Sequence, residues 1–201
     1  MISKQQKPTN SGFHSKTNAD EITKGIDISN KTAIVTGGYS GIGLETTRAL
    51  VTAGAKVIIP AKRKEIACKN LEGIVPNEDI VEMNLENLNS VKKFTEDFKE
   101  NFKKLDLLIN NAGIMACPET RIGNGWESQF AVNHIGHFLL TKELMDTMAE
   151  NDSARFVSLS SSAHSLTGML WDDIHFQNNP YDKWMAYGQS KTASSLIAIE
   201  F

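Results

Sequence analysis

The sequence has 201 residues, of which 40% are hydrophobic and 22% are charged, and its formal net charge is −3 at pH 7. This balance is typical of a globular domain, and it lacks the excess of positive charge that binds nucleic acids or anionic membranes. No apolar run approaches the roughly 18 residues that span a bilayer, so we expect neither a nucleic-acid nor a membrane partner.

Residues 1–30 are rich in Lys, Ser, Thr and Asn, which predicts a flexible N-terminal arm. The first residues include no apolar segment of the kind found in secretory signals. Cys68 and Cys117 are the two cysteines, a number that favours a reducing compartment over a disulfide framework. We therefore expect a cytoplasmic protein with a single domain over residues 31–201.

Short β-branched apolar runs alternate with segments of helical spacing along this domain. The runs that predict strands are 31–37, 55–61, 79–85, 105–113 and 154–162. The segments that predict helices are 42–54, 62–72, 88–102, 126–150 and 184–201. Strands that alternate with helices lie parallel and are joined by right-handed crossovers, so the pattern predicts an α/β fold with a doubly wound parallel sheet.

Four glycines (Gly37, Gly38, Gly41 and Gly43) are concentrated in the segment TGGYSGIGLE, between the first strand and the first helix. Glycine lets a backbone come close to a ligand, and a helix N-terminus attracts anions. This junction is where the pyrophosphate of a dinucleotide binds in such sheets. The spacing Gly37-x-x-x-Gly41-x-Gly43 differs from the common G-x-G-x-x-G fingerprint.

Three further signals follow in chain order. NNAG (110–113) ends the fourth strand, Asn133 lies within AVNHIGHFLLT, and a serine cluster is followed by YGQSK, which places Tyr187 and Lys191 on one helical face. Together with the glycine turn, these motifs resemble the short-chain dehydrogenase/reductase family over residues 31–201. The long interval from Ser161 to Tyr187 resembles its retinol-dehydrogenase-like branch.

The resemblance implies a Rossmann-type sheet of order 3-2-1-4-5 and a catalytic set of Asn133, Ser161, Tyr187 and Lys191. Tyr187 would be the general acid/base, with Lys191 favouring the tyrosinate by its charge and holding the cofactor ribose. Ser161 would hydrogen-bond the reacting oxygen, with Ser160 and Ser162 as the alternatives in register. Asn133 would hold a water that links Lys191 to solvent.

The implied cofactor is NADP, with NAD less favoured. The second strand ends in Pro60-Ala61-Lys62-Arg63, with no carboxylate before Glu65; a guanidinium can grip a 2′-phosphate that a carboxylate would repel. Arg63 is the expected clamp, with Lys62 as its support, and Asn84 is expected at the adenine. The predicted cofactor-binding residues are Gly37, Tyr39, Ser40, Gly41, Ile42, Gly43, Arg63, Asn84, Leu85, Asn111, Ala112, Gly113, Tyr187 and Lys191.

No metal site is expected, since His134, His137, His164 and His175 do not show a ligand spacing supported by a second cluster. The aromatic residues Trp171, Phe176, Tyr181 and Trp184 would either line an apolar substrate site or cover the core. The helices over 126–150 and from 184 resemble those that pair across two-fold axes in the family, which predicts a homo-oligomer.

The first functional hypothesis is an oxidoreductase that transfers hydride between NADP(H) and a small carbonyl or alcohol substrate. The alternative is a catalytically silent NADP-binding fragment or scaffolding protein. A sugar-nucleotide epimerase or dehydratase is disfavoured by the glycine spacing. Because the sequence stops at Phe201, we expect the family's later strands to be missing and this chain alone to be poorly soluble or nearly inactive.

Overall fold

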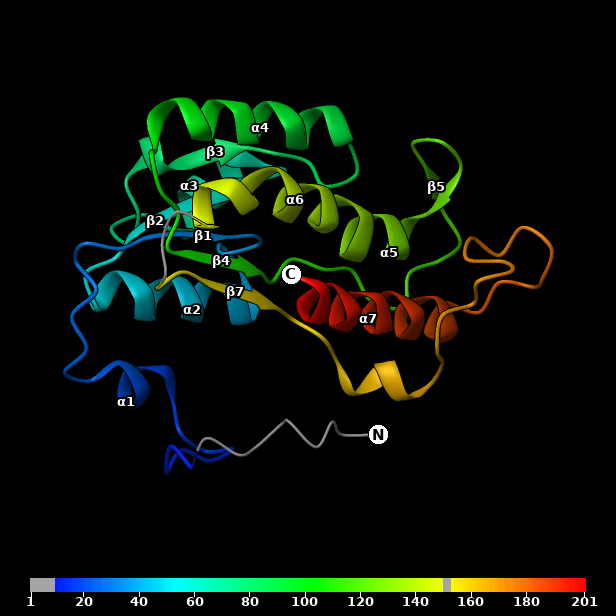
Figure 1. Ribbon diagram of the computed structural model, residues 1–201, viewed down its shortest axis with the longest axis horizontal. Helices are drawn as coiled ribbons and strands as arrows, with labels where there is room; N and C mark the ends of the chain where they lie inside the picture. Colours follow the sequence, from blue (N-terminus) through cyan, green and yellow to red (C-terminus); the bar gives the residue numbers. More distant parts are fainter. Residues whose placement is uncertain (1–9, 150–152) are drawn as a thin grey trace.

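The computed structural model describes residues 10–149 and 153–201. Its centre is a parallel sheet of five strands in the order β3-β2-β1-β4-β7 (Figure 1). The strands are β1 (Thr32–Val35), β2 (Lys56–Ala61), β3 (Ile80–Glu82), β4 (Leu107–Asn110) and β7 (Arg155–Ser158). β7 is the fifth predicted strand, so the predicted doubly wound sheet and its order are confirmed.

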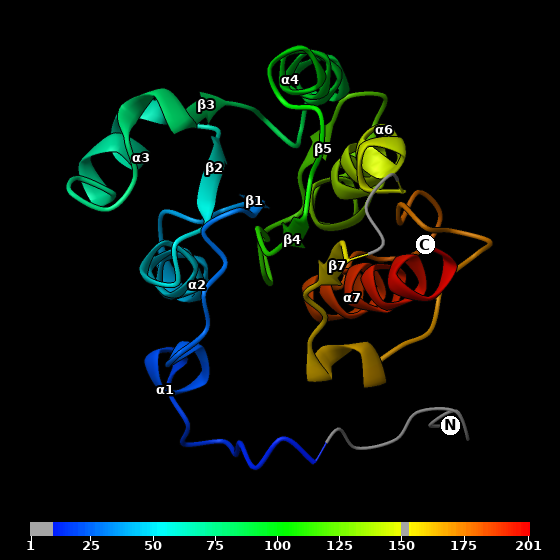
Figure 2. The ribbon, with the colours of Figure 1, turned by 60° about the vertical axis from the view of Figure 1, so that its left-hand side comes forward.

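Helices cover both faces of the sheet. In Figure 2, α4 and α6 lie on one side of the sheet, and α2 and α7 lie on the other. The helices of the domain are α2 (Gly41–Thr52), α3 (Lys64–Asn70), α4 (Leu88–Asn101), α5 (Ser128–Phe130), α6 (Gly136–Ala149) and α7 (Lys183–Glu200). Short turns of other helix types occur at Asn77–Asp79 (η1), Ala131–Ile135 (η2) and Ser162–Ser165 (η3).

The strands divide their side chains between two buried cores. Ile34 of β1 packs with Phe94, Leu140 and other residues of the α4 and α6 side. Its neighbours Ala33 and Val35 pack with Val57, Ala67 and others on the opposite side. Successive residues of a strand point to opposite faces, which explains why a nearly continuous apolar run suits a strand covered on both sides.

The amphipathic helix predicted over 88–102 is confirmed as α4. Asn87 caps it by accepting hydrogen bonds from the backbone N–H groups of Asn89 and Ser90. Val91, Phe94 and Phe98 on its inner face are buried against the sheet. Together with α6, which lies beside it, this helix covers one face of the sheet.

The long helix predicted over 126–150 is wrong at its start. Trp126–Glu127 form strand β6, which pairs antiparallel with β5 (Arg121–Ile122). Gly123 and Gly125 have φ values of 54° and 85°, and these left-handed conformations make the hairpin turn. The helix starts only after Glu127, whose carboxylate accepts the N–H groups of Gln129 and Phe130. Residue 150 lies outside the described residues.

The segment that precedes the domain contains one short helix. α1 (Ala19–Thr23) begins with a capping box between Asn18 and Glu21. Ile28 then packs against the α2 side of the core, and its N–H donates to the Ala53 carbonyl oxygen. The described part of the predicted arm thus contacts the domain, and residues 1–9 lie outside the described residues. None of the helices in residues 10–149 and 153–201 is both long enough and apolar enough to cross a bilayer.

Candidate functional site

The glycine turn brings the end of β1, the start of α2 and the end of β4 into close contact. A Cβ on Gly43 would lie 2.4 Å from both the Gly37 carbonyl oxygen and the Asn111 Nδ2. A Cβ on Gly37 would lie 3.0 Å from the Ala112 Cα, and Gly37 has a φ of 65°. Only glycine fits both positions, so the packing explains the sequence pattern at this junction.

The N-terminus of α2 has no side-chain cap, although Ser40 is at the capping position. The first backbone N–H groups of a helix have no partner within the helix and carry partial positive charge. Ser40 and Ile42 line a cavity at this point, and Ile42 is 75% exposed. Ile42 therefore lies exposed at the start of the helix, where it lines the cavity as one of the predicted cofactor-binding residues.

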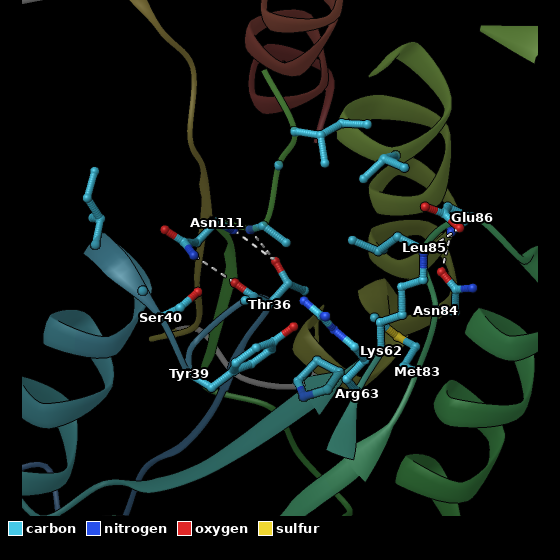
Figure 3. A pocket seen from close by; sticks show the side chains of 18 residues that line it. Thr36, Tyr39, Ser40, Lys62, Arg63, Met83, Asn84, Leu85, Glu86 and Asn111 are labelled. Atoms are coloured by element: carbon cyan, nitrogen blue, oxygen red, sulfur yellow. Dashed lines mark hydrogen bonds and ion pairs between the residues drawn. The ribbon is translucent and has the colours of Figure 1, made fainter. Parts of the chain in front are cut away.

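A cavity of about 600 Å³ runs from the glycine turn across the carboxyl ends of β1, β2, β3 and β4. Pockets of this size accommodate cofactors and other small molecules. Figure 3 shows its labelled side chains, with Thr36 and Asn111 joined by hydrogen bonds. The predicted cofactor residues that line it are Gly37, Tyr39, Ser40, Ile42, Gly43, Arg63, Asn84, Leu85, Asn111, Ala112 and Gly113.

Gly41, Tyr187 and Lys191 do not line this cavity, although they belong to the predicted set. Gly41 has a φ of 53° and no atom near its virtual Cβ, so it serves the conformation of the turn. Six further residues line the cavity that were not among those predicted: Thr36, Pro60, Met83, Glu86, Ile114 and Val132.

Two cations line the cavity at the end of β2, and they differ in their surroundings. Lys62 Nζ lies 2.7 Å from Glu86 Oε2 in an exposed ion pair. Arg63 is exposed and forms no ion pair within residues 10–149 and 153–201. Arg63 therefore offers an uncommitted guanidinium to the cavity, whereas Lys62 shares its charge with a carboxylate.

Asn84 lies on the far side of the cavity, after β3. Its side-chain Oδ1 accepts the backbone N–H of Glu86 at 3.0 Å, and the backbone N–H of Asn84 donates to Ser90 Oγ. These bonds fix the Asx turn that carries Leu85 and Glu86 into the cavity wall. Asn84 Oδ1 keeps a second lone pair, so both Oδ1 and Nδ2 remain able to contact a ligand.

The predicted catalytic residues from the two long helical segments meet beside Gly113. Asn133 holds both backbone groups of Ile114: Oδ1 accepts its N–H and Nδ2 donates to its carbonyl oxygen, each at 2.9 Å. A Cβ on Gly113 would lie 3.2 Å from Asn133 Oδ1 and 3.6 Å from Lys191 Nζ. Asn133 and Lys191 thus flank the wall of the cavity.

The helix that carries Asn133 is locally widened. Ala131–Ile135 form a π-helical turn between α5 and α6. Single π-helical turns within α-helices are frequent at functional sites because they re-aim a side chain. The same turn lets Asn133 Nδ2 also donate to Ser190 Oγ of α7 at 2.9 Å.

Tyr187 and Tyr181 differ in the hydrogen bonding of their hydroxyl groups. Tyr181 OH contacts the buried Glu127 carboxylate, the Cys117 carbonyl oxygen and Gln129 Nε2, and burial raises the pKa of Tyr181 to about 12. The hydroxyl of Tyr187 has no hydrogen-bond partner in residues 10–149 and 153–201. Tyr181 is a structural residue, and Tyr187 keeps its hydroxyl available.

The three serines after β7 have distinct roles. Ser160 Oγ donates to the Lys191 carbonyl oxygen and accepts from Ser195 Oγ, so it ties the strand end to α7. Ser161 caps η3 by accepting the N–H of Ala163. Because η3 packs against Gly188, whose virtual Cβ lies 2.8 Å from the Ala163 carbonyl oxygen, Ser161 is held beside the turn of α7 that follows Tyr187.

The loop between η3 and α7 is fixed by residues of the site helices. Gln189, two residues after Tyr187, is fully buried; its Oε1 accepts the N–H of Leu170 and its Nε2 donates to the Ile174 carbonyl oxygen, each at 2.9 Å. Within the loop, Trp171 is 71% exposed and Phe176 is buried. In the described residues no group of three or more His, Cys, Asp or Glu side chains is arranged to hold a metal ion.

A parallel sheet with a glycine cradle at its carboxyl edge defines a dinucleotide-binding α/β protein. The short chain dehydrogenase family matches residues 31–172. A chloroplastic short-chain dehydrogenase, TIC 32 B of Brassica napus, is 44% identical, over 92% of this chain and 62% of its own. Retinol dehydrogenase 12 of Mus musculus is 38% identical, over 89% of this chain and 58% of its own.

The structure of an uncharacterized protein from Mycobacterium paratuberculosis has a TM-score of 0.74 and 34% identity, and the match covers 85% of this chain and 61% of that one. The chain belongs to the short-chain dehydrogenase family, which confirms the family resemblance and its retinol-dehydrogenase-like character. It spans about 60% of the length of the relatives it matches.

Proposed function

We propose that this chain is an oxidoreductase that transfers hydride between NADP(H) and a carbonyl or alcohol substrate. The observation that carries the proposal is a glycine-lined cavity that has helix N-terminal N–H groups at one end and a cation, Arg63, at another, with Lys191 Nζ 3.6 Å from the position of a Cβ on Gly113 in its wall. Membership of the short-chain dehydrogenase family supports the same class of reaction.

The cavity suits a dinucleotide in shape and charge. Gly37 and Gly43 leave no room for side chains, so the backbone at the start of α2 would receive the pyrophosphate. Arg63 and Lys62 would face the adenosine ribose, where a guanidinium favours a 2′-phosphate. Asn84 would contact the adenine, and Gly113 and Ile114 would border the nicotinamide end beside Asn133.

When bound, NADPH supplies the hydride that reduces the carbonyl carbon. Tyr187 donates its phenolic proton to the carbonyl oxygen as negative charge develops there, and it accepts that proton in the reverse direction. Ser161 donates a hydrogen bond to the same oxygen. Lys191, held by the Leu159 carbonyl oxygen, keeps a positive charge beside Tyr187 and would also bind the nicotinamide ribose. Asn133 would hold the water through which Lys191 exchanges protons with solvent.

An activity screen with both cofactors tests the proposal. The chain would be incubated with NADPH or NADH and a panel of aldehydes and ketones, and with NADP⁺ or NAD⁺ and a panel of alcohols that includes retinol, the alcohol named in the mouse relative. We expect NADPH to bind more tightly than NADH, and any turnover to depend on the cofactor and to be faster with NADP(H). Binding of NADPH without turnover of any substrate would favour the catalytically silent alternative, and failure to bind either cofactor would overturn the proposal.

A further inference from the structure

His137 lies in the first turn of α6 and is 3% exposed. Both of its ring nitrogens contact parts of the site. Nδ1 lies 3.0 Å from the carbonyl oxygen of Asn133, and Nε2 lies 2.9 Å from the hydroxyl of Thr36. The imidazole thus joins the π-helical turn to the end of β1.

The partners determine which nitrogen carries the proton. A carbonyl oxygen only accepts hydrogen bonds, so Nδ1 must be the protonated nitrogen. Nε2 then has a lone pair and accepts the Thr36 hydroxyl proton. The other acceptor near this hydroxyl is the Ile109 carbonyl oxygen, which lies 3.4 Å away and is the poorer partner.

The same hydroxyl oxygen accepts two backbone N–H groups from the cavity wall. The N–H of Asn111 lies 2.9 Å and that of Ala112 lies 3.0 Å from Thr36 Oγ1. A hydroxyl oxygen has two lone pairs, so these two bonds use its full accepting capacity, and the hydroxyl proton must point elsewhere. Nε2 of a neutral His137 provides that acceptor.

We propose that His137, as the neutral Nδ1–H tautomer, is a positioning residue for the cofactor cavity. By accepting the Thr36 hydroxyl proton it orients the Thr36 oxygen toward the N–H groups of Asn111 and Ala112, and so sets the wall of the cavity against the glycine turn. The inference deepens the proposed function and rests on it for the identity of the ligand, but the hydrogen-bond chain itself is a property of the ligand-free protein.

The tautomer is tested directly in the wild-type chain. The ¹⁵N chemical shifts of the His137 ring report which nitrogen carries the proton. We expect Nδ1 to be protonated and Nε2 to be unprotonated at pH 7. Protonation of Nε2 would overturn the proposal without any variant and whether or not a cofactor binds.

Positioning is tested by a double-mutant cycle between His137→Phe and Thr36→Val. His134→Phe is the matched control because His134 lies on the same helical segment, packs between Phe130 and Phe138, and has a buried Nδ1 without a hydrogen-bond partner in the described residues. His137→Gln retains a hydrogen-bonding side chain and serves as the conservative variant.

We expect His137→Phe to speed hydrogen exchange of the Ala112 amide and to weaken NADPH binding, each by about tenfold, as for the loss of one buried hydrogen bond. His137→Gln should keep part of the Ala112 protection and part of the NADPH affinity. His134→Phe should change neither the exchange rate nor the affinity. In the Thr36→Val background, His137→Phe should add little to either effect. Additive effects, or equal effects of His134→Phe, would show a merely structural role and overturn the proposal.

The readouts distinguish the two proposals. A wild-type chain that binds no cofactor would refute the proposed function, while amide exchange and the His137 tautomer would still decide this inference. Should His137→Phe fail to fold, the ¹⁵N shifts of the His137 ring in the wild-type chain still decide the proposal, because Thr36 Oγ1 accepts the Ala112 N–H directly and its removal would speed exchange without any role of His137.

Discussion

Lys191 Nζ lies 5.9 Å from the centre of the Tyr187 ring and donates a hydrogen bond of 2.9 Å to the Leu159 carbonyl oxygen. The two residues are one turn apart on α7, and the carbonyl that holds the ammonium follows β7. Burial lowers the pKa of Lys191, so this contact compensates part of the cost of keeping a charge there. A strand end thus fixes the cation at a set distance from the tyrosine.

The close packing of the glycine turn predicts a large effect of one methyl group. Gly43→Ala would place a Cβ 2.4 Å from the Gly37 carbonyl oxygen, and overpacking of this kind costs about 1–3 kcal/mol. We expect a lower urea midpoint and weaker NADPH binding. The control is Gly168→Ala, because Gly168 has no atom within 4 Å of its virtual Cβ. Equal behaviour of the two variants would contradict the account of the turn.

Cofactor preference should depend on Arg63 more than on Lys62. Arg63→Ala is expected to weaken NADPH binding by about 2 kcal/mol, the loss of a charge-assisted pair, and to leave NADH binding nearly unchanged. Lys62→Ala should have a smaller effect because Glu86 already pairs with Lys62. Titration of each variant with both cofactors measures the four dissociation constants. A greater loss of NADPH binding in Lys62→Ala than in Arg63→Ala would show that Lys62 is the main ligand of the 2′-phosphate.

Glu86 provides an independent test of the same region. Glu86→Gln removes the carboxylate that pairs with Lys62 at 2.7 Å and that lines the cavity. We expect tighter NADPH binding at low salt, by a few fold, because Lys62 becomes available and a repulsive charge is lost. Unchanged NADPH affinity at low salt would show that the 2′-phosphate does not lie near this pair.

Much of the fold could be predicted from the sequence because buried parallel strands and amphipathic helices leave clear periodicities. Val91, Phe94 and Phe98 show a helical period, and α4 follows it. The β5–β6 hairpin was missed because each of its strands has two residues, too few to show a period, and because the predicted helix included Trp126–Glu127. The cavity residues Thr36 and Glu86 were also missed, because their roles arise from contacts between segments distant in sequence.

Histidine burial predicts how stability depends on pH. Burial lowers the pKa of His137 and of His134 to about 4 from 6.5; the nearby charge of Lys191 adds to the effect at His137. The unfolded chain therefore binds more protons between these values, so stability is fully present above about pH 6.5 and declines as the pH falls to about 4. Protonation of each histidine would lower the free energy of unfolding by up to about 3 kcal/mol over this pH range.

Urea unfolding at pH 7 and pH 5 measures this loss. The wild-type chain should lose stability between the two pH values, and His134→Phe should lose less, because one of the two groups has been removed. A wild-type stability that stays constant from pH 7 to pH 4.5 would contradict the neutral state of both rings.

Exposed apolar residues on α6 and α7 support the prediction that the protein associates. Phe138 is 40% exposed and contacts Phe201, and Ile199 is 76% exposed. We expect a dimer or larger species in analytical ultracentrifugation at micromolar concentration, and Phe138→Lys should shift it toward monomer. A monomer in the wild-type chain at that concentration would argue against association through these helices.

The central claim is that Tyr187 carries the proton in a hydride-transfer reaction, and Tyr187→Phe tests it most directly. The substitution removes one hydroxyl that has no partner in the described residues, so the fold and the NADPH affinity should stay close to those of the wild-type chain. With the best substrate from the screen, turnover should fall by at least about 100-fold, the lower range for loss of a general acid. Turnover within a few fold of wild type, at unchanged NADPH affinity, would contradict the account.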